Sequence, residues 1–180
     1  CLPCLSFQSI AESPALSHAA MLHCISLLST AAGWPGMAGG QFLDIAAEGE
    51  DLSLARLEAL HRAKTGALIE ASLVIGAYCA EVAPNNPRLA LLRTFGKRIG
   101  LAFQIVDDIL DETESSATLG KPAGSDQASH KNTFPKLMGL EGARQRAESL
   151  LAESLALLKE ANLGTELLTS LAERSVKRRH

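Results

Sequence analysis

Three aspartates stand close enough in the sequence to hold a metal ion together: Asp107, Asp108 and Asp111, within Phe-Gln-Ile-Val-Asp-Asp-Ile-Leu-Asp. On a helix Asp107 and Asp111 lie one turn apart, with Asp108 beside them and Gln104 on the same face. Carboxylates crowded on one arc repel each other unless a cation relieves them, and Mg²⁺ prefers such oxygen ligands. These residues alone slightly favour a plain solvated face, because the opposite side of the helix carries an ordinary apolar stripe.

Three lysines could face this acidic cluster. Lys64 lies on the preceding predicted helix, and Lys121 and Lys131 follow the aspartates in a Gly-containing segment. A diphosphate needs such an arrangement, because a divalent cation bridges some of its oxygens while point charges hold the others. Either loop lysine taken alone is equally well explained as a solvated side chain on a flexible surface loop.

The composition predicts that helices position these groups. The 180 residues suit one domain with a real core, and the apolar 47% is dominated by Leu and Ala, which favour helices. The net charge of −3 and the aromatic content of 4% argue against a nucleic-acid surface. No apolar run approaches the ~18 residues of a membrane span. The four cysteines suggest reduced thiols in a cytoplasmic protein rather than a disulfide or zinc framework.

The pattern of apolar residues and breakers predicts an all-α chain. The expected helices cover residues 1–12, 14–32, 37–47, 54–82, 87–112 and 135–161, the last one broken near 139–142, with a final helix from about 165. The polar, Gly-rich stretch 113–133 has no periodicity, so we expect a functional loop or a disordered segment there. The paired glycines before Gln41 and the later Gly66 indicate close helix contacts, or a kink in the case of Gly66.

Five short motifs occur in a characteristic order. They are Gly-Gln-x-x-Asp at 40–44, Lys-Thr-Gly at 64–66, Phe-Gln-x-x-Asp-Asp-x-x-Asp at 103–111, Gly-Lys-x-x-Gly-x-Asp at 120–126 and Lys-x-Thr-Phe-Pro at 131–135. Each motif is weak, but the ordered set resembles the C-terminal portion of the trans-isoprenyl diphosphate synthases (polyprenyl synthetase family). Among these it is most similar to the bacterial farnesyl diphosphate synthases, from about Leu2 to the end of the chain.

The resemblance implies an isoprenoid-synthase helical bundle around a deep apolar cavity, here incomplete because N-terminal helices are missing. Residues 1–180 would be the C-terminal part of a single polyprenyl synthetase domain, and the full-length protein would be a homodimer. The implied reaction is a Mg²⁺-dependent condensation of isopentenyl diphosphate with an allylic diphosphate, dimethylallyl or geranyl diphosphate, that gives farnesyl diphosphate.

The resemblance also implies roles for individual residues. The implied metal ligands are Asp107, Asp108 and Asp111, of which Asp107 is the firmest match. The implied catalytic residues are Lys64, Thr65 and Gln104, where the Thr65 and Gln104 oxygens would stabilise a carbocation. The implied substrate-binding residues are Gln41, Asp44, Lys64, Lys121, Asp126, Lys131 and Arg178.

The chain departs from the family pattern in one major respect. The family has two aspartate-rich motifs on facing helices, and this chain contains no second Asp-Asp-x-x-Asp. We therefore expect the sequence to be part of a longer protein and to be inactive in condensation alone. His130 also stands where the family more often has Gly.

Two other functions remain open. A non-catalytic helical partner subunit of a complete synthase would be expected to lose its acidic motif, which this chain keeps. A lyase that cyclises the allylic cation would share the Mg²⁺ chemistry, but it would not be expected to retain Lys-Thr-Gly and the Gly-Lys-x-x-Gly-x-Asp segment.

Overall fold

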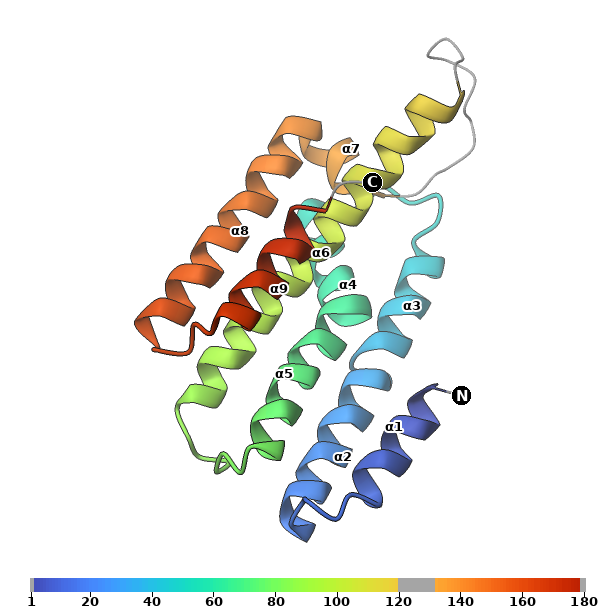
Figure 1. Cartoon of the computed structure of the whole chain (residues 1–180). Helices are drawn as coiled ribbons and strands as arrows, with labels where there is room; N and C mark the ends of the chain where they lie inside the picture. Colours follow the sequence, from blue (N-terminus) through green and yellow to red (C-terminus); the bar gives the residue numbers. More distant parts are fainter. Residues whose placement is uncertain (1, 120–131, 179–180) are drawn as a thin grey trace.

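Within residues 2–119 and 132–178, which the computed structural model describes, the regular elements are all helices (Figure 1). They are α1 (Leu2–Ala11), α2 (His18–Ala32), α3 (Met37–Ala46), α4 (Leu54–His61), the π-helical turn η1 (Arg62–Gly66), α5 (Ala67–Cys79), α6 (Arg88–Leu119), α7 (Phe134–Met138), α8 (Leu140–Glu160) and α9 (Glu166–Val176). The predicted all-α class is confirmed.

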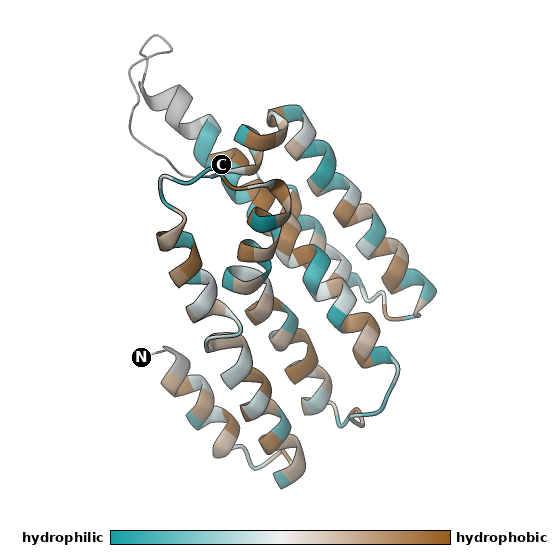
Figure 2. Ribbon diagram, turned by 180° about the vertical axis from the view of Figure 1, so that it is seen from behind, coloured by the Kyte–Doolittle hydropathy of each residue, from teal (hydrophilic) through white to brown (hydrophobic). Residues whose placement is uncertain are grey.

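Helix α6 is the centre of the assembly. It packs against α5 on one side and against α8 and α9 on the other, while α2 covers α5 and α1 covers α2 (Figure 1). Its side chains are buried around much of its circumference, including Phe95, Leu101 and Ile105. The outer helices alternate apolar and polar residues along their length, as expected of helices that bury one face (Figure 2).

Several predicted helix boundaries move. Helix α2 begins at His18 rather than near Pro14, because the Ser17 hydroxyl caps it by accepting the Ala20 backbone N–H at 3.2 Å. Helix α6 continues to Leu119, so the first part of the predicted loop 113–133 is helical. No Gly or Pro interrupts the sequence between Gly100 and Gly120, so the helix can continue beyond the point where the apolar periodicity ends.

The predicted single helix over 54–82 is one rod with an inserted π turn, η1, which the sequence pattern did not reveal. A π turn accommodates an extra residue and is frequent at functional sites. The predicted break in the next long helix is confirmed at Gly139, whose φ of 77° separates α7 from α8.

Glycines let the central helices approach closely. A Cβ added at Gly100 on α6 would lie 2.8 Å from the Cα of Gly66 in η1, and one added at Gly40 on α3 would overlap the backbone nitrogen of Lys64. The predicted close contacts at Gly40 and Gly66 are therefore present, and both involve η1.

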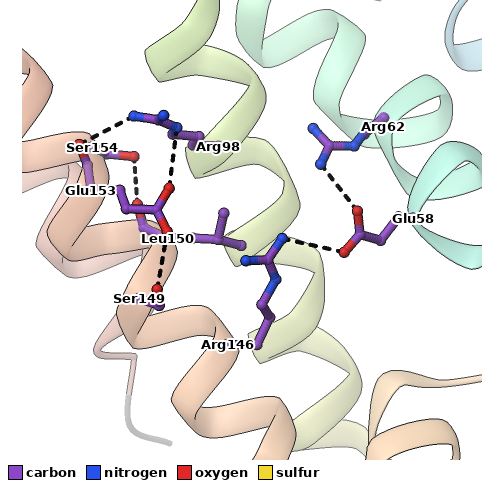
Figure 3. A network of polar contacts seen from close by, with 8 residues as sticks. All are labelled: Glu58, Arg62, Arg98, Arg146, Ser149, Leu150, Glu153 and Ser154. Carbon is purple, nitrogen blue, oxygen red and sulfur yellow. Dashed lines mark hydrogen bonds and ion pairs between the residues drawn. The ribbon is translucent and has the colours of Figure 1, made fainter. Parts of the chain in front are cut away.

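Arginine–carboxylate pairs join the outer helix α8 to its neighbours (Figure 3). Glu58 on α4 accepts from Arg62 at 3.1 Å and from Arg146 on α8 at 3.5 Å, and Arg98 on α6 lies 3.5 Å from Glu153 on α8. Partly exposed pairs contribute little free energy each, so these contacts fix the orientation of α8 more than they stabilise it.

Large apolar side chains are exposed on α2, α3 and the connection between them: Leu22, Trp34, Phe42, Leu43 and Ile45. Burial, followed by the neighbouring Cys79 thiol, raises the pKa of Cys24, which keeps that thiol protonated near neutral pH. None of the described helices is long and apolar enough to cross a membrane.

The close approach of α6 to η1 predicts a position-specific effect of glycine substitution. Gly100→Ala should lower the free energy of unfolding by about 1–3 kcal/mol, because the added methyl group meets backbone rather than a flexible side chain. Urea denaturation measures the effect. The matched control is Gly76→Ala on α5, where an added Cβ meets nothing within 4 Å and should stabilise by roughly 0.5–1 kcal/mol. Equal effects of the two substitutions would contradict the close contact.

Candidate functional site

The π turn η1 aims two consecutive side chains at two different helices. The ammonium group of Lys64 lies 2.5 Å from an Asp44 carboxylate oxygen on α3, and the Thr65 hydroxyl donates to the Gln104 side-chain oxygen on α6 at 2.9 Å. All four of these side chains are partly exposed to solvent. The turn therefore brings together the predicted residues Asp44, Lys64, Thr65 and Gln104.

The hydrogen-bond chain continues from Gln104 into the protein. The Gln104 side-chain nitrogen donates to one Asp108 oxygen at 3.2 Å, and the backbone N–H of Phe134 donates to the other at 3.1 Å. Asp108 is only 1% exposed. Asp108 thus joins α6 to the first residue of α7.

The start of α7 is itself anchored by Asn132. Its side-chain oxygen accepts the Leu52 backbone N–H at 3.0 Å, and its side-chain nitrogen donates to the Glu50 carbonyl at 2.9 Å. These bonds fix the backbone next to Phe134 against the connection between α3 and α4. The amide hydrogen that Asp108 receives is therefore held in place from outside α6.

Asp107 faces a different neighbour. Its side chain is 45% exposed, and one oxygen lies 3.4 Å from the Arg178 guanidinium, which follows α9. Arg178 also donates to the Phe103 carbonyl at 3.1 Å and lies 4.0 Å above the Phe103 ring centroid. A cation held over an aromatic face and paired with a carboxylate fixes the end of α9 beside Asp107.

The three carboxylates that were predicted to lie on one arc differ in exposure. The 100° step per residue of an α-helix turns Asp108 inward, while Asp107 is half-exposed and Asp111 is exposed. Across residues 2–119 and 132–178 no group of three or more His, Cys, Asp or Glu side chains is arranged to hold a metal ion. Asp107 and Asp111 remain one turn apart on the outer face, and their carboxylate oxygens are of the type that fits Mg²⁺.

The other predicted site residues divide into two groups. Gln41 is exposed on α3, one turn before Asp44. Lys121, Asp126 and Lys131 fall within 120–131, outside the residues that the structure describes.

Sequence analysis missed His61, which is 3% exposed and whose ring nitrogen Nε2 lies 3.6 Å from an Asp108 oxygen. One signal could have found it: His61 lies one turn after the buried Leu57, on the apolar side of its helix. A titratable side chain at such a position is unusual, because histidine buried in a core requires polar partners.

Similarity to known proteins extends over most of the chain. The sequence profile of the polyprenyl synthetase family matches residues 2–167. The chain is 44% identical over 176 residues to the farnesyl diphosphate synthase of Escherichia coli (strain K12), which covers 96% of this chain and 58% of that enzyme. It is also 44% identical over 149 residues to the heterodimeric geranylgeranyl pyrophosphate synthase large subunit 1 of Arabidopsis thaliana, covering 81% of this chain and 40% of that protein.

Among solved structures, a geranyltransferase from Helicobacter pylori complexed with magnesium and isoprenyl diphosphate superposes with a TM-score of 0.77 at 33% identity. The match covers 95% of this chain and 55% of the other. The chain thus spans less than two thirds of the length of each of these relatives.

The Arg178 contacts predict a local stabilisation of α9. Arg178→Ala should destabilise the docked end of α9 by about 1 kcal/mol, because it removes one partly exposed ion pair and one cation–π contact. Hydrogen exchange should show α9 amides exchanging about fivefold faster, which corresponds to that energy. Lys177→Ala is the matched control, since among the described residues Lys177 pairs with Glu173, one helical turn before it, at 3.1 Å. Unchanged α9 exchange in Arg178→Ala would contradict the anchoring role.

Proposed function

The chain belongs to the polyprenyl synthetase family, and on that premise we propose that it carries the diphosphate and carbocation site of a short-chain trans-prenyltransferase. The proposed reaction joins isopentenyl diphosphate to an allylic diphosphate, dimethylallyl or geranyl diphosphate, and forms farnesyl diphosphate in a Mg²⁺-dependent step. The observation that carries the proposal is the η1 turn, which sets a cationic Lys64 directly beside the Thr65–Gln104 oxygen pair.

Lys64 would hold the diphosphate. A lysine ammonium has three hydrogen-bond donors, and among the described residues Asp44 accepts from one of them, so the other two would bind diphosphate oxygens. The Asp44 carboxylate keeps the ammonium in place before the substrate binds. Charge-assisted bonds of this kind strengthen as negative charge collects on a departing diphosphate.

Thr65 and Gln104 would stabilise the allylic cation. The Thr65 hydroxyl hydrogen is directed at the Gln104 side-chain oxygen, so the lone pairs of the Thr65 oxygen point elsewhere. The Gln104 oxygen accepts one hydrogen bond and keeps a second lone pair. Two fixed oxygen dipoles next to a lysine suit the separation of a cation from a diphosphate.

Asp107 and Asp111 would hold Mg²⁺ on the outer face of α6. When bound, the ion would neutralise charge on the diphosphate as it leaves. Arg178 keeps the Asp107 carboxylate oriented at the surface. The remaining proposed substrate contacts are Gln41 and Asp44 on α3 with Lys121, Asp126, Lys131 and Arg178.

We also propose that the whole protein is a homodimer. Exposed apolar side chains around α2 and α3, among them Trp34, Phe42 and Ile45, supply the kind of surface that mediates contact with another chain.

The direct test of function is an assay of the protein expressed from its complete gene, with isopentenyl and geranyl diphosphate as substrates. Farnesyl diphosphate is the expected product, and absence of any prenyl transfer to isopentenyl diphosphate, with geranyl or with dimethylallyl diphosphate as the allylic substrate, would refute the proposal.

Substitution of Asp107 tests the metal role. Asp107→Ala should lower kcat by at least about 100-fold and raise the Mg²⁺ concentration needed for half-maximal rate, because a ligand to the charge-neutralising ion is lost. Steady-state kinetics across a Mg²⁺ series measures both quantities. Glu112→Ala, an exposed carboxylate on the same helix, is the control. A loss of only a few fold in Asp107→Ala would rule out metal binding by this residue.

Substitution of Lys64 tests the diphosphate role. Lys64→Ala should raise the KM of the allylic diphosphate about 10–100-fold, since a hydrogen bond to a charged group contributes about 1.5–3 kcal/mol. Lys97→Ala is matched in charge and also pairs with a carboxylate, Glu70 at 3.8 Å, but this pair joins α6 to α5 rather than η1 to α3. Equal KM values for the two variants would contradict diphosphate binding by Lys64 and leave it a purely structural role.

A further inference from the structure

His61 is a buried polar side chain that the proposed reaction does not use. It is the last residue of α4 and directly precedes η1, and it is 3% exposed. Within the described part of the chain, neither of its ring nitrogens is within hydrogen-bond distance of a partner. Its ring stacks on Phe134, with centroids 5.6 Å apart and planes at 26°.

Among the described residues, the carboxylate that lies beside the His61 ring is that of Asp108. The distance from Nε2 to the Asp108 oxygen Oδ2 is 3.6 Å, and that same oxygen accepts the Phe134 backbone N–H at 3.1 Å. Buried polar groups in folded proteins are nearly always paired, and a buried carboxylate needs positive or donor groups around it. His61 therefore faces Asp108 from the α4 side, and Phe134 faces it from α7.

The hydrogen-bond pattern around Asp108 fixes the orientation of the Gln104 amide. A carboxylate accepts hydrogen bonds, so the group that Gln104 turns toward Asp108 is its nitrogen, at 3.2 Å. The amide oxygen must then point toward Thr65, whose hydroxyl donates to it at 2.9 Å. A reversed amide would place oxygen against oxygen at Asp108, and Thr65 would then have to accept from the amide nitrogen instead of donating to its oxygen.

We propose that His61 is a positioning residue that acts through Asp108 to fix the direction of the Gln104 and Thr65 oxygens at the carbocation site. The proposal rests on the function proposed above, and it assigns Asp108 an internal orienting role beside the outward-facing Asp107 and Asp111. His61 touches neither substrate nor reacting atoms. Because it directly precedes η1, it couples the orientation of Gln104 to the turn that carries Lys64 and Thr65.

The first test uses kinetics at a single pH with the protein expressed from its complete gene. His61→Phe keeps the ring stack on Phe134 but removes the nitrogen that faces Asp108. It should lower kcat about 10–100-fold, the usual effect of removing a group that orients a catalytic residue, with little change in the KM of geranyl or isopentenyl diphosphate. The matched control is His23→Phe, since His23 stacks on Tyr78 in a similar way, at 5.3 Å and 23°, and its kinetics should not change.

Amide substitutions guard against a variant that simply fails to fold. His61→Gln places a donor nitrogen close to the position of Nε2, whereas the shorter side chain in His61→Asn cannot. If His61 positions Gln104 through Asp108, His61→Gln should recover most of kcat and His61→Asn should not, at similar melting temperatures. Equal kcat for these two variants would overturn the proposal.

A double-mutant cycle tests whether His61 acts through Asp108. Asp108→Asn places an amide group where the Gln104 nitrogen finds a carboxylate, so it should lower kcat by itself. If His61 works through Asp108, adding His61→Phe to Asp108→Asn should cause little further loss, because coupled residues are non-additive. Fully multiplicative losses would show independent roles and would overturn the proposal.

A readout independent of activity separates this inference from the proposed function. The side-chain amide ¹⁵N–¹H signals of Gln104 report its bond to Asp108 directly. They should shift and exchange faster in His61→Phe, stay near the wild-type position in His61→Gln, and remain unchanged in His23→Phe. If the wild-type protein transfers no prenyl group, the proposed function fails while these signals still decide the inference. Unchanged Gln104 signals in His61→Phe would overturn the inference even in an active enzyme.

Discussion

The arrangement depends on the close backbone contacts made by the π turn η1. Gly100 lets α6 approach Gly66, and Gly40 lets α3 approach Lys64, because no Cβ separates the backbones at either contact. This proximity allows short side chains to bridge the elements. The Thr65 hydroxyl reaches Gln104 on α6, and Lys64 reaches Asp44 on α3. Larger residues at the glycine positions would move the helices apart and separate these pairs.

Asp108 shows why an acidic motif cannot be interpreted from its carboxylates alone. It is nearly fully buried between α6 and α7, where it receives hydrogen bonds from Gln104 and Phe134 and faces His61. Burial removes the solvation of a carboxylate, so the surrounding donors must replace it. Its neighbour Asp107 keeps access to solvent and pairs with Arg178. Two adjacent residues of the same type thus have different environments, and we propose different roles for them.

Much of the fold and part of the site follow from the sequence. The Leu- and Ala-rich periodicity predicts the all-α class, the break at Gly139 and the amphipathic faces, because these depend on local propensity and on a 3.6-residue repeat. The ordered motifs indicate the family, and they select Lys64, Thr65 and Gln104, which the structure brings together. Helix ends were less predictable, since α6 continues to Leu119 on residues that are neither apolar nor helix-breaking.

Only the tertiary structure decided which of these residues meet. No local pattern shows that an extra residue makes a π turn, that Asp107 faces Arg178, or that His61 meets Asp108. These features arise where helices distant in sequence pack together, and their side-chain directions depend on the contact between α4, α6, α7 and the end of α9. The sequence by itself determined the helices and the chemical groups that they carry. Packing across glycine contacts and the pairing of a buried carboxylate determined how those groups are oriented.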